Sequence, residues 1–165
     1  MASAHDHSAH KNPDPDSGDA WVVAANGEKY WGRFGAAGLL AYDPDRGILL
    51  QHRAEWTSHG DTWGVPGGAR HRTEDAVTAA FRETVEETGI NTDSLTVITE
   101  YKIDKQIWHY TTVIARATAA TVAADWNEET IEMRWIPLPE VASYKLHPGF
   151  RDAWPELLEI LSAIS

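Results

Sequence analysis

The chain contains no cysteine, and this absence excludes three kinds of site at once. A disulfide framework, a thiol nucleophile and a zinc site built on thiolates all require that residue. Carboxylates and histidines are therefore the strong metal ligands that the sequence offers. This ligand set favours a hard cation that is coordinated by oxygen.

Long apolar runs and an excess of positive charge are also missing. No stretch approaches the roughly 18 consecutive apolar residues of a membrane-spanning helix, so we expect no such helix. The 14 lysine and arginine residues are outnumbered by 25 aspartate and glutamate residues, which gives a formal net charge of −11. A chain this acidic repels polyanions, which disfavours general nucleic-acid binding. A small anionic substrate that arrives with a divalent cation is compatible with the charge.

The length and composition fit one globular unit. A chain of 165 residues, of which 42% are hydrophobic and 24% charged, matches a single domain with one core. After Met1 the first 20 residues contain no large apolar side chain, so we expect a disordered tail over residues 1–20 and a domain over residues 21–165. The tail has neither the apolar segment of a secretory signal nor the arginines of a transit peptide, and a cytoplasmic location is expected.

The distribution of apolar residues predicts a sheet followed by a terminal helix. Five segments rich in apolar, β-branched and aromatic residues are predicted to form strands: 36–42, 48–52, 95–101, 107–115 and 131–136. The first two are joined by an Asp-Pro-Asp-Arg-Gly turn, which indicates a hairpin. Near the end of the chain, apolar residues recur at helical spacing and predict an amphipathic helix.

Another helix is predicted over residues 73–88, with Thr73 as its N-cap. On a wheel with about 100° per residue, Glu83, Glu86 and Glu87 fall within one arc, apart from the packing face. Like charges at this spacing cost only about 0.2–0.5 kcal/mol per pair. A solvated acidic face is therefore one interpretation of the three carboxylates, and a cation site is the other.

A glycine-rich loop and an arginine stand at fixed distances from these carboxylates. The arrangement resembles the Nudix box, in which a Gly is followed after five residues by Glu and, seven residues later, by Arg-Glu-U-x-Glu-Glu-x-Gly-U, where U is bulky and aliphatic. The residues in register are Gly68, Glu74, Arg82, Glu83, Glu86, Glu87, Gly89 and Ile90. Thr84 occupies the first U position, where we expect its hydroxyl to bond back to a carbonyl one turn earlier.

The resemblance implies a fold and a reaction. The fold is an α/β/α sandwich with a mixed β-sheet. The reaction is hydrolysis of a diphosphate linkage in a nucleoside diphosphate joined to another group, such as a nucleoside triphosphate or a nucleotide derivative, with Mg²⁺ as cofactor and Mn²⁺ as a possible substitute. The implied metal ligands are Glu86, Glu87 and the Gly67 carbonyl, with Glu83 as ligand or general base and with Arg82 and Glu74 orienting Glu83.

Four residues outside the box are weaker candidates. Arg53 and Arg70 could pair with phosphate oxygens because a guanidinium group matches them bidentately, although loop arginines are as often solvated. Nudix relatives often add a carboxylate from a later loop, which points to Glu128 or Glu129. A solvated loop charge is the alternative for both.

The chain has eight tryptophans, and an indole ring is a good stacking surface for a nucleobase. Four lie in patterns that predict packing: Trp21, Trp31, Trp135 and Trp154. The other four lie nearer the expected site: Trp56, Trp63, Trp108 and Trp126. Tryptophan is more often a core residue than a ligand contact, so we assign none of them to the site.

The resemblance does not determine the subfamily. The residues around Lys105 and Gln106 lack the proline that marks many ADP-ribose hydrolases, and the chain is similar to small, MutT-like members that act on nucleoside triphosphates. A non-catalytic module that senses a nucleotide or sugar-nucleotide is an alternative function, and a purely structural domain is a third. A homodimer is possible because homodimers are common among relatives.

Overall fold

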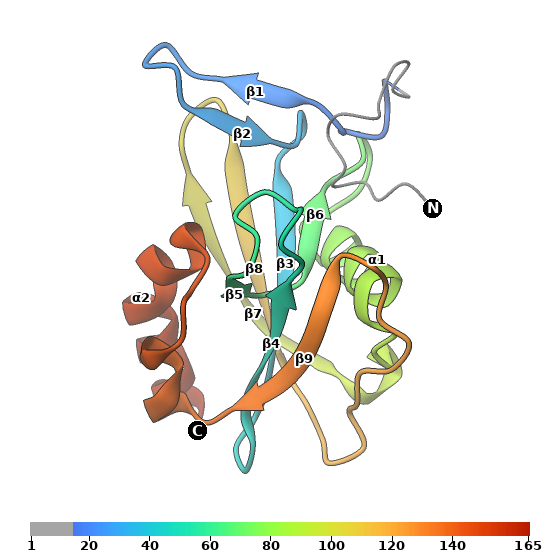
Figure 1. Ribbon diagram of the computed structural model, residues 1–165, viewed down its shortest axis with the longest axis vertical. Helices are drawn as coiled ribbons and strands as arrows, with labels where there is room; N and C mark the ends of the chain where they lie inside the picture. The colour runs from blue at the N-terminus through green and yellow to red at the C-terminus, as the bar shows by residue number, and fades with distance from the viewer. Residues whose placement is uncertain (1–14) are drawn as a thin grey trace.

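A seven-stranded mixed sheet lies between two helices in the computed structural model, which describes residues 15–165 (Figure 1). The strands of this sheet are β3 (Ala36–Asp43), β4 (Gly47–Arg53), β5 (Trp63–Gly64), β6 (Gly67–Ala69), β7 (Thr96–Asp104), β8 (His109–Arg116) and β9 (Thr130–Ile136). They run in the order β5-β4-β3-β8-β7, with β6 paired to β3 and β9 paired to β4. β3 and β8 are parallel, and the other pairs are antiparallel. The predicted α/β/α sandwich with a mixed sheet is confirmed.

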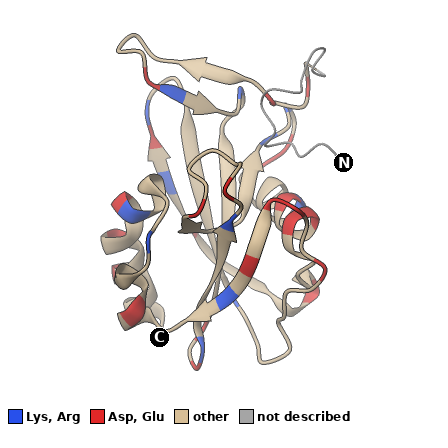
Figure 2. Ribbon diagram, viewed as in Figure 1, with Lys and Arg blue, Asp and Glu red and all other residues tan. Residues whose placement is uncertain are grey.

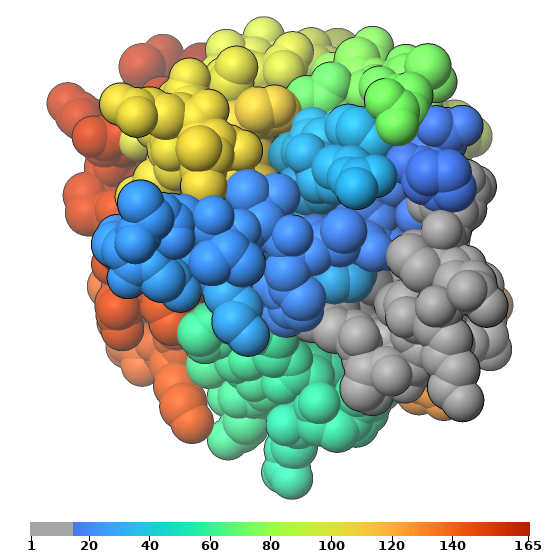
Figure 3. Space-filling model, turned by 90° about the horizontal axis from the view of Figure 1, so that it is seen from above, coloured from blue at the N-terminus to red at the C-terminus, as the bar shows by residue number. Residues whose placement is uncertain are grey.

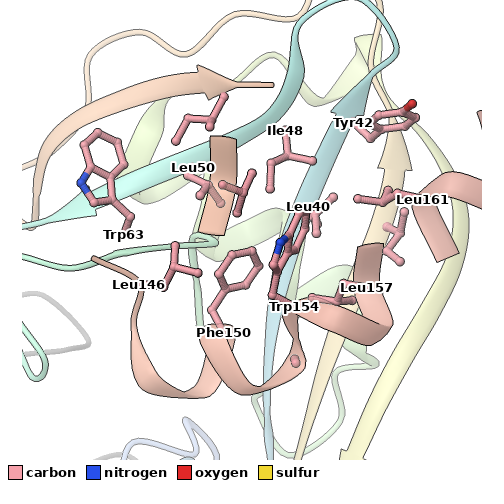
Figure 4. Packing of buried hydrophobic residues seen from close by; sticks show 14 residues of the cluster. Leu40, Tyr42, Ile48, Leu50, Trp63, Leu146, Phe150, Trp154, Leu157 and Leu161 are labelled. Carbon is pink, nitrogen blue, oxygen red and sulfur yellow. The ribbon is translucent and has the colours of Figure 1, made fainter. Parts of the chain in front are cut away.

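The two helices, α1 (Ala76–Thr88) and α2 (Pro148–Ile164), cover opposite faces of the sheet. Two short 3₁₀ turns, η1 (Thr92–Ser94) and η2 (Leu138–Ser143), complete the connections. Successive side chains of a strand point to opposite faces, so β3 is buried on both sides. Leu39 packs toward α1, whereas Leu40 packs toward α2. The α2 side holds the larger core, which includes Leu157 and Leu161 from the helix (Figure 4).

The five predicted strands correspond to β3, β4, β7, β8 and β9, so their existence is confirmed. The prediction missed β5 and β6, because segments of two and three residues are too short to show a period. It also missed a hairpin of β1 (Trp21–Val23) and β2 (Lys29–Trp31), which pair only with each other in the described chain. The Asn26-Gly27 dipeptide between them is a hairpin signal that could have revealed it.

The N-cap of helix α1 lies two residues later than predicted. Its N-cap is Asp75, whose side chain accepts a hydrogen bond from Thr78 N at 2.8 Å, so the prediction of Thr73 as N-cap is wrong. The C-terminal end is confirmed, since Gly89 adopts a left-handed φ of 64° and its N–H donates to the Val85 carbonyl oxygen. A capping aspartate satisfies the helix terminus as well as a threonine does. The short polar run before the helix therefore did not determine the boundary.

The expected hydrogen bond of Thr84 is confirmed, because its Oγ1 donates to the Ala80 carbonyl oxygen at 2.6 Å.

Of the predicted tail, residues 1–14 lie outside the described residues. Residues 15–20 run along the domain, where Asp16 forms an ion pair of 2.6 Å with Arg72. Among the described helices none is long and apolar enough to cross a membrane.

Candidate active site

Gly67 and Gly68 begin β6, a short strand of the sheet that follows the preceding loop. β6 pairs with β3 so that Gly67 is opposite Gly38. A Cβ atom on Gly67 would overlap the carbonyl oxygen of Ala37, so only glycine fits at this approach. The close approach brings the N–H of Gly67 to within 3.3 Å of Glu87 Oε1 on α1. The loop and the helix therefore meet at the carboxylates of the box.

A single guanidinium group joins three parts of the box. Arg82 donates from Nε and Nη2 to the two oxygens of Glu74, at 2.7 and 2.9 Å, in a bidentate pair. Its Nη1 donates to Glu83 Oε2 at 2.7 Å, and its Nη2 also reaches the Ala69 carbonyl oxygen at 3.1 Å. This network fixes Glu83 to the loop that precedes the helix. The predicted contacts of Arg82 with Glu74 and with Glu83 are present in the structure.

The network keeps its members charged. The hydrogen bond with Glu74 raises the pKa of Arg82, and burial only partly opposes this effect. Burial also works against ionisation of Glu74, but the hydrogen bonds from Arg82 and from His71 N outweigh it and lower the pKa of Glu74. The side chain of Arg82 therefore remains a fixed cation beside Glu83 at neutral pH.

The three carboxylates of α1 differ in exposure. Glu83 and Glu87 are each only 2% exposed, so a solvated acidic face is the wrong interpretation for these two residues. Glu86 is the accessible member, with 38% of its side chain exposed, and its Oε1 lies 3.8 Å from Arg82 Nη1. Buried carboxylates require compensation by hydrogen bonds or by cations. The arrangement therefore differs from an ordinary charged helix surface.

Sequence reasoning missed one residue of this site, Gln51 on β4. Its Nε2 donates to Glu87 Oε1 at 3.2 Å and to Thr130 Oγ1 at 2.8 Å. Gln51 is 2% exposed and follows a run of apolar residues in the same strand. A glutamine that ends such a buried run was the signal that could have identified it.

The donor set of the box matches the chemistry of a hard divalent cation. Carboxylate and carbonyl oxygens are the ligands that Mg²⁺ prefers. Glu87 Oε1 accepts hydrogen bonds from two donors, Gln51 Nε2 and Gly67 N. Both donors are uncharged, so a nearby cation would stabilise the buried carboxylate further. Within residues 15–165 no three acidic or histidine side chains are already gathered in a metal-binding group. The residues fit such an ion chemically without being preassembled around it.

The candidates outside the box separate into two pairs. Arg53 is partly buried and lines a cavity, and its pKa is lowered by burial although the charges of Glu87 and Glu129 oppose this shift. Glu129 is buried, whereas its neighbour Glu128 is exposed. Arg70 donates from Nε and Nη2 to the Glu74 carbonyl oxygen, at 3.1 and 2.7 Å, and thus braces the loop. The structure brings Arg53 and Glu129 to the site and leaves Arg70 and Glu128 outside it.

The loop that precedes β9 lies beside the end of α1. Asn127 N donates to the Glu87 carbonyl oxygen at 3.0 Å, and Ala54 N donates to the Glu129 carbonyl oxygen at 2.8 Å. Figure 2 shows acidic residues of this loop on the same side of the molecule as those of α1. The backbone of this loop, which carries Glu128 and Glu129, therefore contacts the end of the helix that carries Glu87.

A cavity of roughly 510 Å³ opens next to the box. Its walls include Gly67, Gly68 and Arg53 on one side and residues of the β1–β2 hairpin and the start of α2 on the others. This volume falls within the range of about 300–1,000 Å³ that is typical of small-molecule sites. The site thus combines a carboxylate cluster with adjoining space for a ligand.

Comparisons with known proteins agree with this geometry. The family profile described as the NUDIX domain matches residues 32–157. A putative 8-oxo-dGTP diphosphatase 3 of Mycobacterium tuberculosis is 46% identical over 150 residues, which cover 85% of this chain and 69% of that protein. A nucleoside triphosphate pyrophosphatase/Nudix hydrolase fusion protein of Bifidobacterium longum is 37% identical over 156 residues, which cover 90% of this chain and 32% of that protein.

Solved structures show the same fold. The Nudix hydrolase RenU from M. smegmatis superposes with a TM-score of 0.79 at 41% identity, covering 90% of this chain and 98% of that one. An Ap4A hydrolase from C. elegans superposes with a TM-score of 0.63 at 21% identity, covering 78% of this chain and 98% of that one, and at this identity it supports the fold alone. With the box in register and the profile spanning most of the chain, this protein belongs to the Nudix family and is a pyrophosphohydrolase.

Proposed function

We propose that this enzyme hydrolyses a nucleoside triphosphate in a reaction that depends on Mg²⁺, for which Mn²⁺ can substitute. The observation that carries the proposal is the burial of Glu83 and Glu87 on α1, with Glu87 Oε1 3.3 Å from Gly67 N, beside a cavity of substrate size that Gly67 and Gly68 line. Such a placement concentrates negative charge where a polyphosphate must also bind, which is favourable only with cations present.

Four groups of the chain would hold the cation: the carboxylates of Glu83, Glu86 and Glu87 and the carbonyl oxygen of Gly67. When bound, a divalent cation neutralises phosphate charge and makes a bound water more acidic. Glu86 is the exposed carboxylate of the three, with 38% of its side chain accessible. Mg²⁺ also keeps several waters, so a few protein oxygens are sufficient.

The remaining polar residues position the reactants. Arg82 holds the carboxylate of Glu83, which serves as ligand or general base, and Glu74 anchors Arg82 from the other side. Arg53 borders both the cavity and the carboxylates, so it pairs with a phosphate oxygen of the substrate. Glu129 is the carboxylate that the later loop adds, as a further ligand or as the base.

The substrate class follows from the relatives together with the cavity. The relative from M. tuberculosis, which is 46% identical, carries the name of an enzyme that acts on 8-oxo-dGTP. A cavity of roughly 510 Å³ is large enough for a nucleoside. We therefore place oxidised and canonical purine nucleoside triphosphates first among the substrates.

The test is the release of pyrophosphate and phosphate from nucleoside triphosphates, ADP-ribose, dinucleoside polyphosphates and sugar nucleotides. Each reaction is run with Mg²⁺, with Mn²⁺ and with a chelator, on the wild type and on the Glu86→Gln variant. Glu86 is exposed, so its substitution leaves the fold intact, and Glu156→Gln on the exposed face of α2 is the matched control.

We expect turnover that depends on the metal and falls by about two to three orders of magnitude in Glu86→Gln but not in Glu156→Gln. Binding of a nucleotide without turnover across the whole panel would instead identify the protein as a sensing module. Turnover that is insensitive to both the chelator and Glu86→Gln would overturn the assignment of the metal site.

We further propose a cytoplasmic enzyme that acts on small nucleotides and not on nucleic acids, and that can form a homodimer. The formal charge of −11 supports the exclusion of polyanions. Light scattering of the purified protein tests the dimer, and titration with duplex DNA at low salt tests the absence of nucleic-acid binding.

A further inference from the structure

The β1–β2 hairpin lies outside the residues that the family profile matches. The family profile begins at residue 32, directly after Trp31 at the end of β2. Even so, the hairpin supplies Trp21, Tyr30 and Trp31 to the walls of the cavity that Gly67 and Arg53 also line. The hairpin extends across the top of the molecule, beside the turn between β7 and β8 (Figure 3). A segment outside the profile therefore forms one wall of the cavity beside the box.

Two contacts to one side chain fasten the hairpin. The ring of Trp108, which precedes β8, stacks on Tyr30 with centroids 4.7 Å apart and planes 14° apart. The Nε1–H of Trp108 donates to the Trp31 carbonyl oxygen at 3.1 Å. An aromatic stack combined with a directional hydrogen bond fixes both the distance and the orientation of the wall. Trp108 also lines the cavity.

The chemistry of this wall favours a planar, uncharged group. Three tryptophans and a tyrosine contribute aromatic surface, and Trp21 packs edge-to-face on Trp31 with centroids 5.2 Å apart. The hairpin itself contributes one charge of each sign to the lining, Lys29 and Glu28. The balance of these charges gives the wall no net preference for an anion. The anionic part of a substrate is thus left to Arg53 and the glycine loop.

We propose that the β1–β2 hairpin, held by Trp108, is the specificity-determining wall that packs against the nucleobase of the substrate. This assignment rests on the proposed function, in that it takes the substrate to be a nucleotide. Trp31 contributes aromatic surface to the base, and Trp108 is a positioning residue for the hairpin. The selectivity for the base is then located in residues that the family profile does not include.

The experiment compares ligands with and without a base. Wild type, Trp31→Leu and Trp108→Leu are assayed for kcat and KM on the best nucleoside triphosphate. They are also assayed for competitive inhibition by the matching nucleoside monophosphate and by imidodiphosphate, which has no base. Trp135→Leu is the matched control, because this half-buried indole stacks with Arg46 and does not line the cavity.

We expect Trp31→Leu and Trp108→Leu to raise KM and the inhibition constant of the monophosphate by about tenfold or more, the size of a lost base–aromatic contact. The inhibition constant of imidodiphosphate and kcat should change by less than about threefold. Trp108→Phe, which retains a stack on Tyr30 but loses the hydrogen bond, should fall between wild type and Trp108→Leu. A general loss of folding would weaken both inhibitors alike and is thereby distinguished.

The inference is overturned if both leucine variants bind the monophosphate as the wild type does, or if Trp135→Leu weakens it equally. Failure of the proposed function has a different signature, since the wild type itself would then turn over no nucleotide. In that case calorimetric titration of the monophosphate into wild type and variants still decides the role of the hairpin.

Discussion

The side-chain amide of Gln51 and the carboxylate of Glu87 are joined by a hydrogen bond of 3.2 Å, from Nε2 to Oε1. The bond links β4 to α1 inside the core, where both residues are 2% exposed. The same Nε2 donates to Thr130 Oγ1 at the start of β9. Gln51 thus contacts a proposed metal ligand on α1 directly from the sheet.

Replacement of Gln51 by leucine should weaken metal binding. The substitution removes a donor to a buried carboxylate, a change that costs about 1–3 kcal/mol. We expect the Mg²⁺ concentration for half-maximal activity to rise about five- to a hundredfold, with a smaller change in kcat. Calorimetric titration of Mn²⁺ into the free protein provides a readout that does not depend on turnover. Thr130→Val leaves the bond of Gln51 to Glu87 in place and removes the contacts of Thr130 Oγ1 with Gln51 Nε2 and with the Glu87 carbonyl oxygen. An equal effect from that variant would argue against a specific role for the bond between Gln51 and Glu87.

The Arg82→Lys variant should retain its fold and lose most of its activity. A lysine carries the charge but cannot pair bidentately with Glu74 while it also reaches Glu83. We expect kcat to fall by about two orders of magnitude, comparable to the loss of a group that orients a catalytic residue. Arg70→Lys is the control, since among the described residues the side chain of Arg70 donates hydrogen bonds to the Glu74 carbonyl oxygen alone. Similar losses in the two variants would contradict the special position of Arg82.

A Gly67→Ala substitution should destabilise the fold. The new methyl group would overlap the backbone of β3 at Ala37, which cannot move without disturbing the sheet. We expect the free energy of unfolding to fall by about 1–3 kcal/mol in urea titrations. Gly149→Ala provides the comparison. A Cβ atom at residue 149 would lie 3.4 Å from the nearest atoms of the His147 ring, which is an ordinary contact distance. Equal stability of the two variants would show that the loop can shift away from the sheet.

Stability should decrease as the pH falls, in part through Glu74. The pKa of this carboxyl in the folded protein lies below its ordinary value of 4.5, because hydrogen bonds from Arg82 and His71 N outweigh the effect of burial. The ionised form therefore stabilises the fold above about pH 4.5, and this contribution is lost as the pH falls through the lowered pKa. Urea unfolding at pH 7 and at a series of pH values from 4.5 downward measures the difference. Glu74→Gln should be less stable at pH 7 and should show a shallower pH dependence than the wild type; an unchanged slope would exclude Glu74 as a contributor.

Much of the site could be predicted because the box is local in sequence. The residues from Gly67 to Gly89 are placed by one loop and one helix, whose spacing is visible in the chain itself. Gln51 and the choice between Glu128 and Glu129 could not be predicted, because they depend on how β4 pairs with β9 across the sheet. The burial of Glu83 and Glu87 could not be predicted either. A helical wheel shows which residues share a face of the helix, but it does not show which other elements cover that face.

The hairpin of β1 and β2 forms no ladder with the main sheet in the described part of the chain, whereas α1, β4 and β6 hold the carboxylates within or directly on that sheet. The main sheet and α1 therefore carry the core and the carboxylates, whereas the β1–β2 hairpin carries the base recognition that we propose. Substitutions within residues 21–31 can accumulate at little cost to the buried sheet. Such a separation gives evolution, or an engineer, a region in which to change the preferred nucleotide while the hydrolytic apparatus stays as it is.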